Sequence, residues 1–249
     1  MIKPSEYQAS RNLLKNKVIL VTGGGSGIGK EAAFAFAQHG AEVILLGKHA
    51  SHLEETYDLF EKHNLKKPLL QTIDLETAEE EDFKQISKAV LKEFGKLDGL
   101  LNNASILGDK TPIRNYDSHQ WKRVLKINLE SGFLLTKALL PVLEIPNNSS
   151  IIFTSSGVGK KGRAYWGAYA VSKFATEGLM QILSEELENT SCIRVNSINP
   201  GPVRTKMRAE AYPAEDPKTL PNPKNIMNAY LFLMGEDSLS VSGKSIEAQ

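Results

Sequence analysis

Cysteine is almost absent from this sequence of 249 residues, because Cys192 is the only one. A disulfide within the chain is therefore excluded. The scarcity favours a reducing, cytoplasmic location, since disulfide frameworks belong to oxidising compartments. Cys192 opens the run "CIRVNSI", in which apolar residues alternate, so we interpret it as a packed strand residue and not as a reactive thiol.

The chain also lacks a charge imbalance. Its 30 Lys and Arg residues stand against 29 Asp and Glu residues, which leaves a net charge of +1. Nucleic acids and acidic membrane surfaces attract a basic excess, so we expect neither as a partner. Long apolar runs are missing too: the first residues contain no signal-peptide core, and no run reaches the ~20 residues that span a bilayer. We also expect no metal site.

No internal repeat or low-complexity tract divides the chain, so we expect a single domain over residues 1–249. Short β-branched runs alternate with longer helical patterns, and this order predicts a parallel sheet covered by helices on both faces. The predicted fold class is α/β, a doubly wound, Rossmann-like sheet of about seven strands. The expected strands are 17–22, 42–47, 68–73, 97–103, 150–156, 192–198 and 244–248, and the expected helices are 27–39, 51–64, 79–94, 118–143, 168–189 and 222–234.

Glycine, in contrast, is concentrated in one place. The stretch "VTGGGSGIGK" at 21–30 follows the first expected strand and opens the first expected helix. There, glycine lets the backbone approach a pyrophosphate, whose charge is met by the helix N-terminus. The spacing Gly23-x-x-x-Gly27-x-Gly29 is one residue longer than the common dinucleotide fingerprint, and a purely structural tight turn is the alternative. A P-loop is excluded, because Glu31 stands where Ser or Thr would be needed.

The longer spacing resembles the TGxxxGIG signature of the short-chain dehydrogenases/reductases, since residues 22–29 read "TGGGSGIG". Further motifs similar to those of this family follow in order: "NNAS" at 102–105, "SSGVG" at 155–159, "YAVSK" at 169–173 and "NPGPVRT" at 199–205. The ordered set is far more specific than any single member. The sequence around the tyrosine is similar to that of the YciK-type oxidoreductases of bacteria, a subgroup whose substrate is only loosely assigned. The resemblance implies an enzyme that interconverts a carbonyl and an alcohol by hydride transfer.

Tyr169 and Lys173 are four residues apart, so a helix places them on one face. A free tyrosine has a pKa of about 10, and a neighbouring ammonium group is expected to lower it, which makes Tyr169 a candidate acid/base. In the family, the catalytic serine precedes the tyrosine by thirteen residues, which points to Ser156; Ser155 is expected to face the other side of the strand. The resemblance also implies that Lys173 holds the nicotinamide ribose. It gives Asn128 a place in a proton relay, by local opening of its helix, with an ordinary polar helix residue as the alternative.

The end of the second expected strand indicates which nicotinamide cofactor is bound. An acidic residue at this place accepts hydrogen bonds from the ribose 2′-hydroxyl of NAD. Here Gly47 occupies the place and Lys48 follows, so a cation is available for a 2′-phosphate. We expect NADP(H) to be preferred over NAD(H), and an exposed Lys48 without this role is the alternative. The residues expected to bind the cofactor, most of them by resemblance, are Gly23, Gly25, Ser26, Gly27, Ile28, Gly29, Lys48, Asp74, Leu75, Asn103, Ala104, Tyr169, Lys173, Pro200, Val203 and Thr205.

Substrate contacts are specified more weakly. The segment 206–220 is expected to form a lid over the substrate. The candidates for the pocket walls are Ile106, Leu107, Tyr165 and Trp166, although each of them is also compatible with simple packing.

By resemblance, the helices at 118–143 and 168–189 form a subunit contact, so we expect a homodimer or a homotetramer. The ending "VSGKSIEAQ" departs from the glycine-rich ending common in the family, which weakens the expectation of a tetramer. Two functions remain open: an NADP-dependent oxidoreductase acting on a small carbonyl or alcohol, and a non-catalytic NAD(P)-binding redox sensor or scaffold. The joint presence of Ser156, Tyr169 and Lys173 favours the enzyme.

Overall fold

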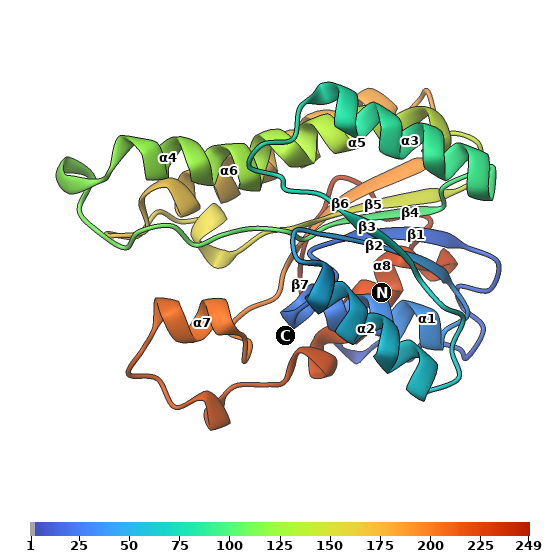
Figure 1. Cartoon of the computed structure of the whole chain (residues 1–249), viewed down its shortest axis with the longest axis horizontal. Coiled ribbons are helices and arrows are strands. Elements are labelled where there is room, and N and C mark those ends of the chain that lie inside the picture. Colours follow the sequence, from blue (N-terminus) through green and yellow to red (C-terminus); the bar gives the residue numbers. More distant parts are fainter. Residues whose placement is uncertain (1–2) are drawn as a thin grey trace.

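The computed structural model describes residues 3–249, and these form one sheet of seven strands (Figure 1). The strand order is β3-β2-β1-β4-β5-β6-β7, and every neighbouring pair is parallel. The order reverses between β1 and β4, and the crevice beyond the strand ends at such a reversal is where ligands bind in open α/β sheets. The strands are β1 (Val18–Thr22), β2 (Glu42–Gly47), β3 (Leu69–Thr72), β4 (Gly99–Asn102), β5 (Ser149–Thr154), β6 (Ile193–Asn199) and β7 (Ser245–Glu247).

The central strands are buried along their whole length because both faces of the sheet are covered. Every residue of β1 and β5 is buried. Near-continuous apolar strands are typical of parallel sheets, in which helical crossovers shield both sides. The predicted doubly wound α/β fold is confirmed.

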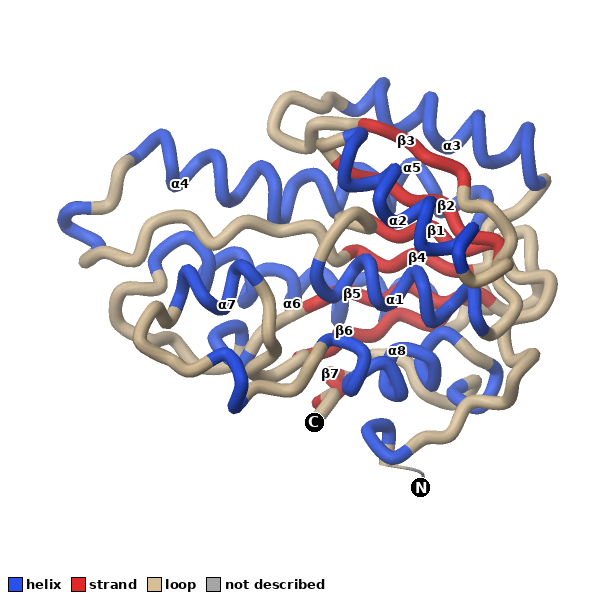
Figure 2. The backbone as a smooth tube through the Cα atoms, turned by 60° about the horizontal axis from the view of Figure 1, so that its bottom comes forward, coloured by secondary structure: helices blue, strands red, loops and turns tan. Residues whose placement is uncertain are grey.

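Two layers of helices cover the sheet (Figures 1 and 2). Helices α1, α2 and α8 pack on one face, where Phe36, Phe60 and Tyr230 are fully buried. Helices α3, α5 and α6 pack on the other face. None of the helices within residues 3–249 combines the length and apolarity needed to cross a bilayer. The α-helices are α1 (Gly27–Gln38), α2 (Ala50–Lys62), α3 (Glu80–Phe94), α4 (Ser118–Leu125), α5 (Ser131–Leu143), α6 (Gly167–Leu187), α7 (Lys206–Ala211) and α8 (Met227–Met234).

Of two local features, the first agrees with the local opening expected at Asn128 and the second differs from the sequence-based expectation. The helix expected over 118–143 is interrupted by one wider turn, a π-helical segment at Lys126–Glu130, which joins α4 to α5. The interpretation of Cys192 as a packed strand residue is wrong: its side chain is exposed, and β6 begins one residue later, at Ile193. The apolar alternation is real, but it applies only from the residue that first pairs with β5.

Candidate active site

The glycine-rich turn connects β1 to α1, and the backbone at its two ends is in close contact. Gly23 and Gly27 have φ angles of 68° and 53°, in the left-handed region that side chains disfavour. A Cβ placed on Gly29 would lie 2.3 Å from the Gly23 carbonyl oxygen, and one on Gly25 would lie 2.8 Å from His52 Cβ. Only glycine fits at Gly29, because backbone on the other side of the turn cannot move away. The turn thus presents bare backbone at the start of α1.

Thr22 fixes the end of β4 against this turn. Its hydroxyl accepts hydrogen bonds from the backbone N–H groups of Asn103 and Ala104, each at 2.9 Å, and donates to the Leu101 carbonyl. Thr154, at the end of β5, donates to Asn103 Oδ1 at 3.3 Å. Three strand ends are therefore tied together at one point, which holds the residues that follow them in place.

A cavity of about 330 Å³ opens at these strand ends. It brings together residues that lie far apart in the sequence: the glycine turn, the ends of β4 and β5, the start of α6 and the segment 200–211. The predicted site residues that line it are Gly23, Ser26, Gly27, Ile28, Asn103, Ala104, Ser156, Tyr169, Lys173, Pro200, Val203 and Thr205.

The other predicted site residues lie around this cavity and do not line it. Gly25 and Gly29 support the turn from behind. Leu75 and Asn128 line a second, smaller cavity, and Lys48 and Asp74 contact each other. Of the candidate pocket walls, Leu107 and Trp166 line the large cavity, Ile106 packs against the core, and Tyr165 is exposed. Lining residues that sequence reasoning missed include Thr154, whose side chain carries no motif of its own, and His52.

Tyr169 lines this cavity and is buried, and burial raises its pKa to about 12. A hydrogen bond with the Ser156 side chain opposes that rise. Lys173 Nζ lies 5.6 Å from the centre of the Tyr169 ring and donates to the Thr154 carbonyl at 2.7 Å. The expected lowering of the tyrosine pKa by this lysine is not found: desolvation of the buried phenol raises the pKa, and the opposing contribution comes from Ser156.

Burial acts on Lys173 in the opposite direction and lowers its pKa to about 8, because the charged form of an amine is the one that loses hydration. Tyr169 and Lys173 thus have pKa values displaced from those of free side chains, in opposite directions. Perturbed groups that share a cleft are typical of functional sites. Ser155 is buried beside them, and its hydroxyl finds no hydrogen-bond partner among residues 3–249.

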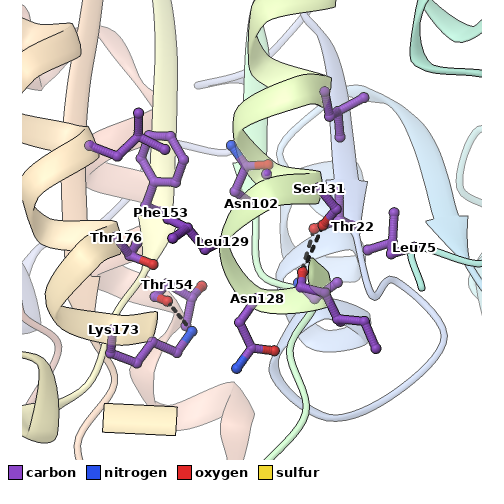
Figure 3. Close-up of a pocket in the computed structure, with 15 residues that line it drawn as sticks. Thr22, Leu75, Asn102, Asn128, Leu129, Ser131, Phe153, Thr154, Lys173 and Thr176 are labelled. Carbon is purple, nitrogen blue, oxygen red and sulfur yellow. Dashed lines mark hydrogen bonds between the residues drawn. The ribbon is translucent and has the colours of Figure 1, made fainter. Parts of the chain in front are cut away.

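The π-helical segment places Asn128 next to this pair. Its side-chain amide donates to the Ile106 carbonyl and to Ser172 Oγ, at 2.9 and 3.1 Å, and its oxygen accepts from the Ile106 N–H at 2.8 Å. A cavity of about 20 Å³ lies among Asn128, Asn102, Thr154 and Lys173 (Figure 3). This volume is of the size that one water molecule needs.

Lys48 forms an ion pair at the end of β2. Its Nζ lies 2.8 Å from Asp74 Oδ2 and 3.9 Å from Glu76 Oε2. The hydrogen bond from Lys48 holds the pKa of Asp74 below its usual value. Sequence reasoning named Lys48 and Asp74 for separate contacts, and their pairing was missed because they follow different strands.

The segment 206–220 begins with α7 and closes one side of the large cavity. Arg208 forms two hydrogen bonds with Glu215, each of 2.6 Å. Lys110, which follows β4, donates to the Ala211 carbonyl at 2.6 Å. The same ammonium lies over the rings of Trp166 and Tyr212, at 4.8 and 4.6 Å from their centres. Long side chains, and not regular backbone pairing, therefore attach this segment to the rest of the site.

Comparisons with known proteins agree with this architecture. Residues 17–216 match the family model for short chain dehydrogenases. The Escherichia coli oxidoreductase YciK is 44% identical over 243 residues, which is 98% of this chain and 96% of that protein. A short-chain dehydrogenase structure from Pseudomonas syringae is 50% identical, with a TM-score of 0.97 over 98% of this chain and 99% of that one. A Shigella flexneri structure in complex with NADP is 45% identical, with a TM-score of 0.93 over 96% of this chain and 100% of that one.

Proposed function

We propose a function from the premise that this chain belongs to the short-chain dehydrogenase family and is an oxidoreductase. The proposed reaction is the NADP(H)-dependent interconversion of a carbonyl compound and an alcohol. The observation that carries this proposal is the convergence of Ser156, Tyr169 and Lys173 on the same cavity as the glycine turn. A phenol, a hydroxyl and an ammonium group beside a bare backbone turn suit proton transfer next to a bound dinucleotide.

The residues at the strand ends fit such a dinucleotide. The cradle at Gly23, Gly25 and Gly29 has no room for side chains, and the first turn of α1 leaves backbone N–H groups free for a pyrophosphate. We assign the ribose and nicotinamide end to Asn103, Ala104, Lys173, Pro200, Val203 and Thr205, and the adenine end to Asp74 and Leu75. When bound, the nicotinamide supplies or accepts the hydride.

The side chains of the chain itself supply the proton. Ser156 orients the oxygen of the substrate by a hydrogen bond, and Tyr169 donates the proton to that oxygen or removes it in the reverse direction. Lys173 stabilises the phenolate electrostatically. The small cavity between Asn128 and Lys173 suits a single water molecule, which supports a place for Asn128 in a proton relay.

NADP(H) is proposed over NAD(H) because no acidic side chain stands at Gly47 and Lys48 lies beside it. In the structure Lys48 is paired with Asp74 yet remains half-exposed, so its ammonium can turn to a 2′-phosphate with little rearrangement. Related structures solved with NADP and NADPH support this proposal. Lys48→Met should then weaken NADPH binding by roughly tenfold and change NADH binding little, in line with one lost charge-assisted contact.

The substrate end of the cavity is lined by Leu107, Trp166 and Met207, which pack together with Tyr169. We infer a carbonyl compound with an apolar body, covered by residues 206–220 as a lid. We further propose a homo-oligomer assembled through α5 and α6, because these helices expose Phe133, Val171, Phe174 and Ile182. Exposed apolar patches of this kind are typical of protein contacts.

Titration of the purified protein with NADPH and NADH, followed by fluorescence and calorimetry, tests the cofactor first. Tighter binding of NADPH is expected. Better binding of NADH would overturn the assignment of Lys48, and binding of neither would remove the basis for an oxidoreductase.

Tyr169→Phe then tests the chemistry on any substrate found by a carbonyl screen with NADPH. The variant should bind NADPH as the wild type does, and its turnover should fall by about 100- to 10,000-fold, the usual contribution of a positioned acid/base. Normal turnover in this variant would exclude Tyr169 as the acid/base. If the wild type binds NADPH but turns over no carbonyl compound, the non-catalytic redox sensor or scaffold would be favoured.

A further inference from the structure

Glu177 is a buried carboxylate that the proposed reaction does not use. It lies in α6, one turn after Lys173, and is 7% exposed. Ser197 Oγ of β6 donates to one of its oxygens at 2.8 Å, and Ser245 Oγ of β7 donates to the other at 3.0 Å. These two serines are direct partners in the β6–β7 ladder, so the two strands hold the carboxylate from both sides.

Both hydrogen bonds come from neutral hydroxyl groups. Within residues 3–249, no cation lies within 4.0 Å of this carboxylate. A buried charge is expensive unless an opposite charge compensates it. The spacing of four residues places Glu177 on the same face of α6 as Lys173, with Cβ atoms about 5–6 Å apart.

The environment of Lys173 contains few other charged or titratable groups. On its own helix these are Tyr169 and Glu177. The neighbouring elements contribute neutral groups: Thr154 of β5 and Asn128 of the π-helical segment lie at Lys173, and the two serines of β6 and β7 lie at Glu177. Glu247 of β7 turns away and bonds Lys160 and Asn199.

We propose that Glu177 is a positioning residue for the active site: its carboxylate, fixed by Ser197 and Ser245, keeps the buried Lys173 protonated. This role presupposes the proposed function of Lys173. Burial of the lysine favours its neutral form, and the negative charge one turn away opposes that effect. The short strand β7 thus acts on the site through its serine hydroxyl, although no part of β7 lines the large cavity.

The test is the titration of Lys173 itself, which needs neither cofactor nor substrate. In protein labelled with ¹³Cε-lysine, the Lys173 signal is the one missing from Lys173→Met, and its pKa of about 8 separates it from the ordinary value of 10.5. In Glu177→Gln, this pKa should fall further, by about one unit, because the opposite charge that favours the protonated amine is removed. The matched control is Glu185→Gln, which removes an exposed negative charge from the same helix and should leave the Lys173 titration in place.

An unchanged Lys173 titration in a folded Glu177→Gln protein would overturn the proposal and leave Glu177 as an anchor between α6 and the sheet. If Glu177→Gln does not fold, the proposal is tested on the wild-type protein by following the NMR signal of Glu177 against pH. The ¹³Cδ signal of Glu177 must then move at the pH at which Lys173 loses its proton, and a flat signal there overturns the proposal equally.

Activity gives a second and separate readout. Once a substrate is known, Glu177→Gln should move the alkaline limb of the kcat/KM profile to lower pH, because Lys173 loses its proton earlier. A purely structural role would lower activity at every pH without moving the limb. Failure of the carbonyl screen would remove the assay but leave the lysine titration valid, so the two proposals can fail independently.

Discussion

The two walls of the large cavity are built in different ways. The cofactor wall, residues 22–29 with 102–104, is backbone packed on backbone: the Gly23 N–H donates to the Leu46 carbonyl at 2.8 Å, and Gly29 leaves no space for a Cβ. The lid, residues 206–220, is attached by the ends of long side chains, such as Lys110 to the Ala211 carbonyl and Arg204 to the Pro217 carbonyl. The first wall accepts very few residue types. The second can change sequence and keep its form, which suits a surface that sets substrate preference.

Gly29→Ala is expected to have the largest effect, because it breaks the cofactor wall at its tightest point. The new Cβ would meet the Gly23 carbonyl at 2.3 Å, so the turn must open and the backbone loses its approach to the pyrophosphate. We expect the Kd for NADPH to rise about 100-fold or more, equivalent to about 2.7 kcal/mol, by calorimetry.

Gly178→Ala is the matched control for that variant. Gly178 lies in α6 with nothing within 4 Å of a Cβ. Alanine should stabilise the helix by about 0.5–1 kcal/mol in urea unfolding and leave NADPH binding unaltered. Comparable NADPH affinity in the two variants would mean that close packing of the turn does not matter for binding.

This difference between the walls also explains which parts of the fold and of the candidate site could be predicted from the sequence. The strands and the glycine turn follow from local patterns, because only glycine suits Gly29 and short, mainly apolar, β-branched runs are typical of strands buried on both faces. The pairing of Lys48 with Asp74, and the position of Lys110 between Trp166 and Tyr212, depend on long side chains that tertiary structure brings together. No motif encodes them.

The pKa of Tyr169 was unpredictable for a similar reason. The spacing to Lys173 gave the neighbour correctly, but the depth of burial, which raises the pKa, depends on how Trp166 and the lid cover the ring. The wider helical turn at Asn128 matches the local opening implied by the family resemblance, although no spacing in the segment predicts it.

Lys173→Met extends the comparison to a cavity residue outside the lid. Burial destabilises the charged form of the Lys173 side chain in α6. The lysine pKa falls from 10.5 to about 8 on folding. Between these pH values the unfolded chain binds the proton that the folded chain lacks, so the contribution of Lys173 to stability rises with pH across this window and is least favourable below pH 8. Part of the penalty is offset by the negative charge of Glu177, and the ammonium also donates a hydrogen bond to the Thr154 carbonyl.

We therefore expect the stability of Lys173→Met relative to the wild type to fall by about 2 kcal/mol between pH 7 and pH 10, because only the wild type gains stability across this window. Urea unfolding at both pH values measures this. Lys161→Met, which removes an exposed lysine, should show no such dependence on pH. A stability difference between Lys173→Met and the wild type that does not change with pH would show that folding leaves the pKa of Lys173 unaltered.

Lys110→Met tests the lid and is expected to have the smallest effect. It removes the bond to the Ala211 carbonyl and the cation from between Trp166 and Tyr212, contacts worth about 1 kcal/mol each. Because Arg208 and Glu215 still brace the lid internally, only its closed position should weaken. We expect KM for a carbonyl substrate to rise about three- to fivefold, in line with partial loss of these contacts, and the Kd for NADPH to stay unchanged.

Fluorescence can detect the same change without a substrate. Trp121 and Trp166 are the two tryptophans of the chain, so in a Trp121→Phe background the signal comes from Trp166 alone. Lys110→Met should alter that emission, whereas Lys161→Met should not. If Lys110→Met leaves the emission unchanged but weakens NADPH binding, Lys110 belongs to the cofactor wall and the division between the two walls is wrong. If both readouts change as expected, the lid can be altered without disturbing the cofactor wall, and substrate preference can vary on a fixed dinucleotide site.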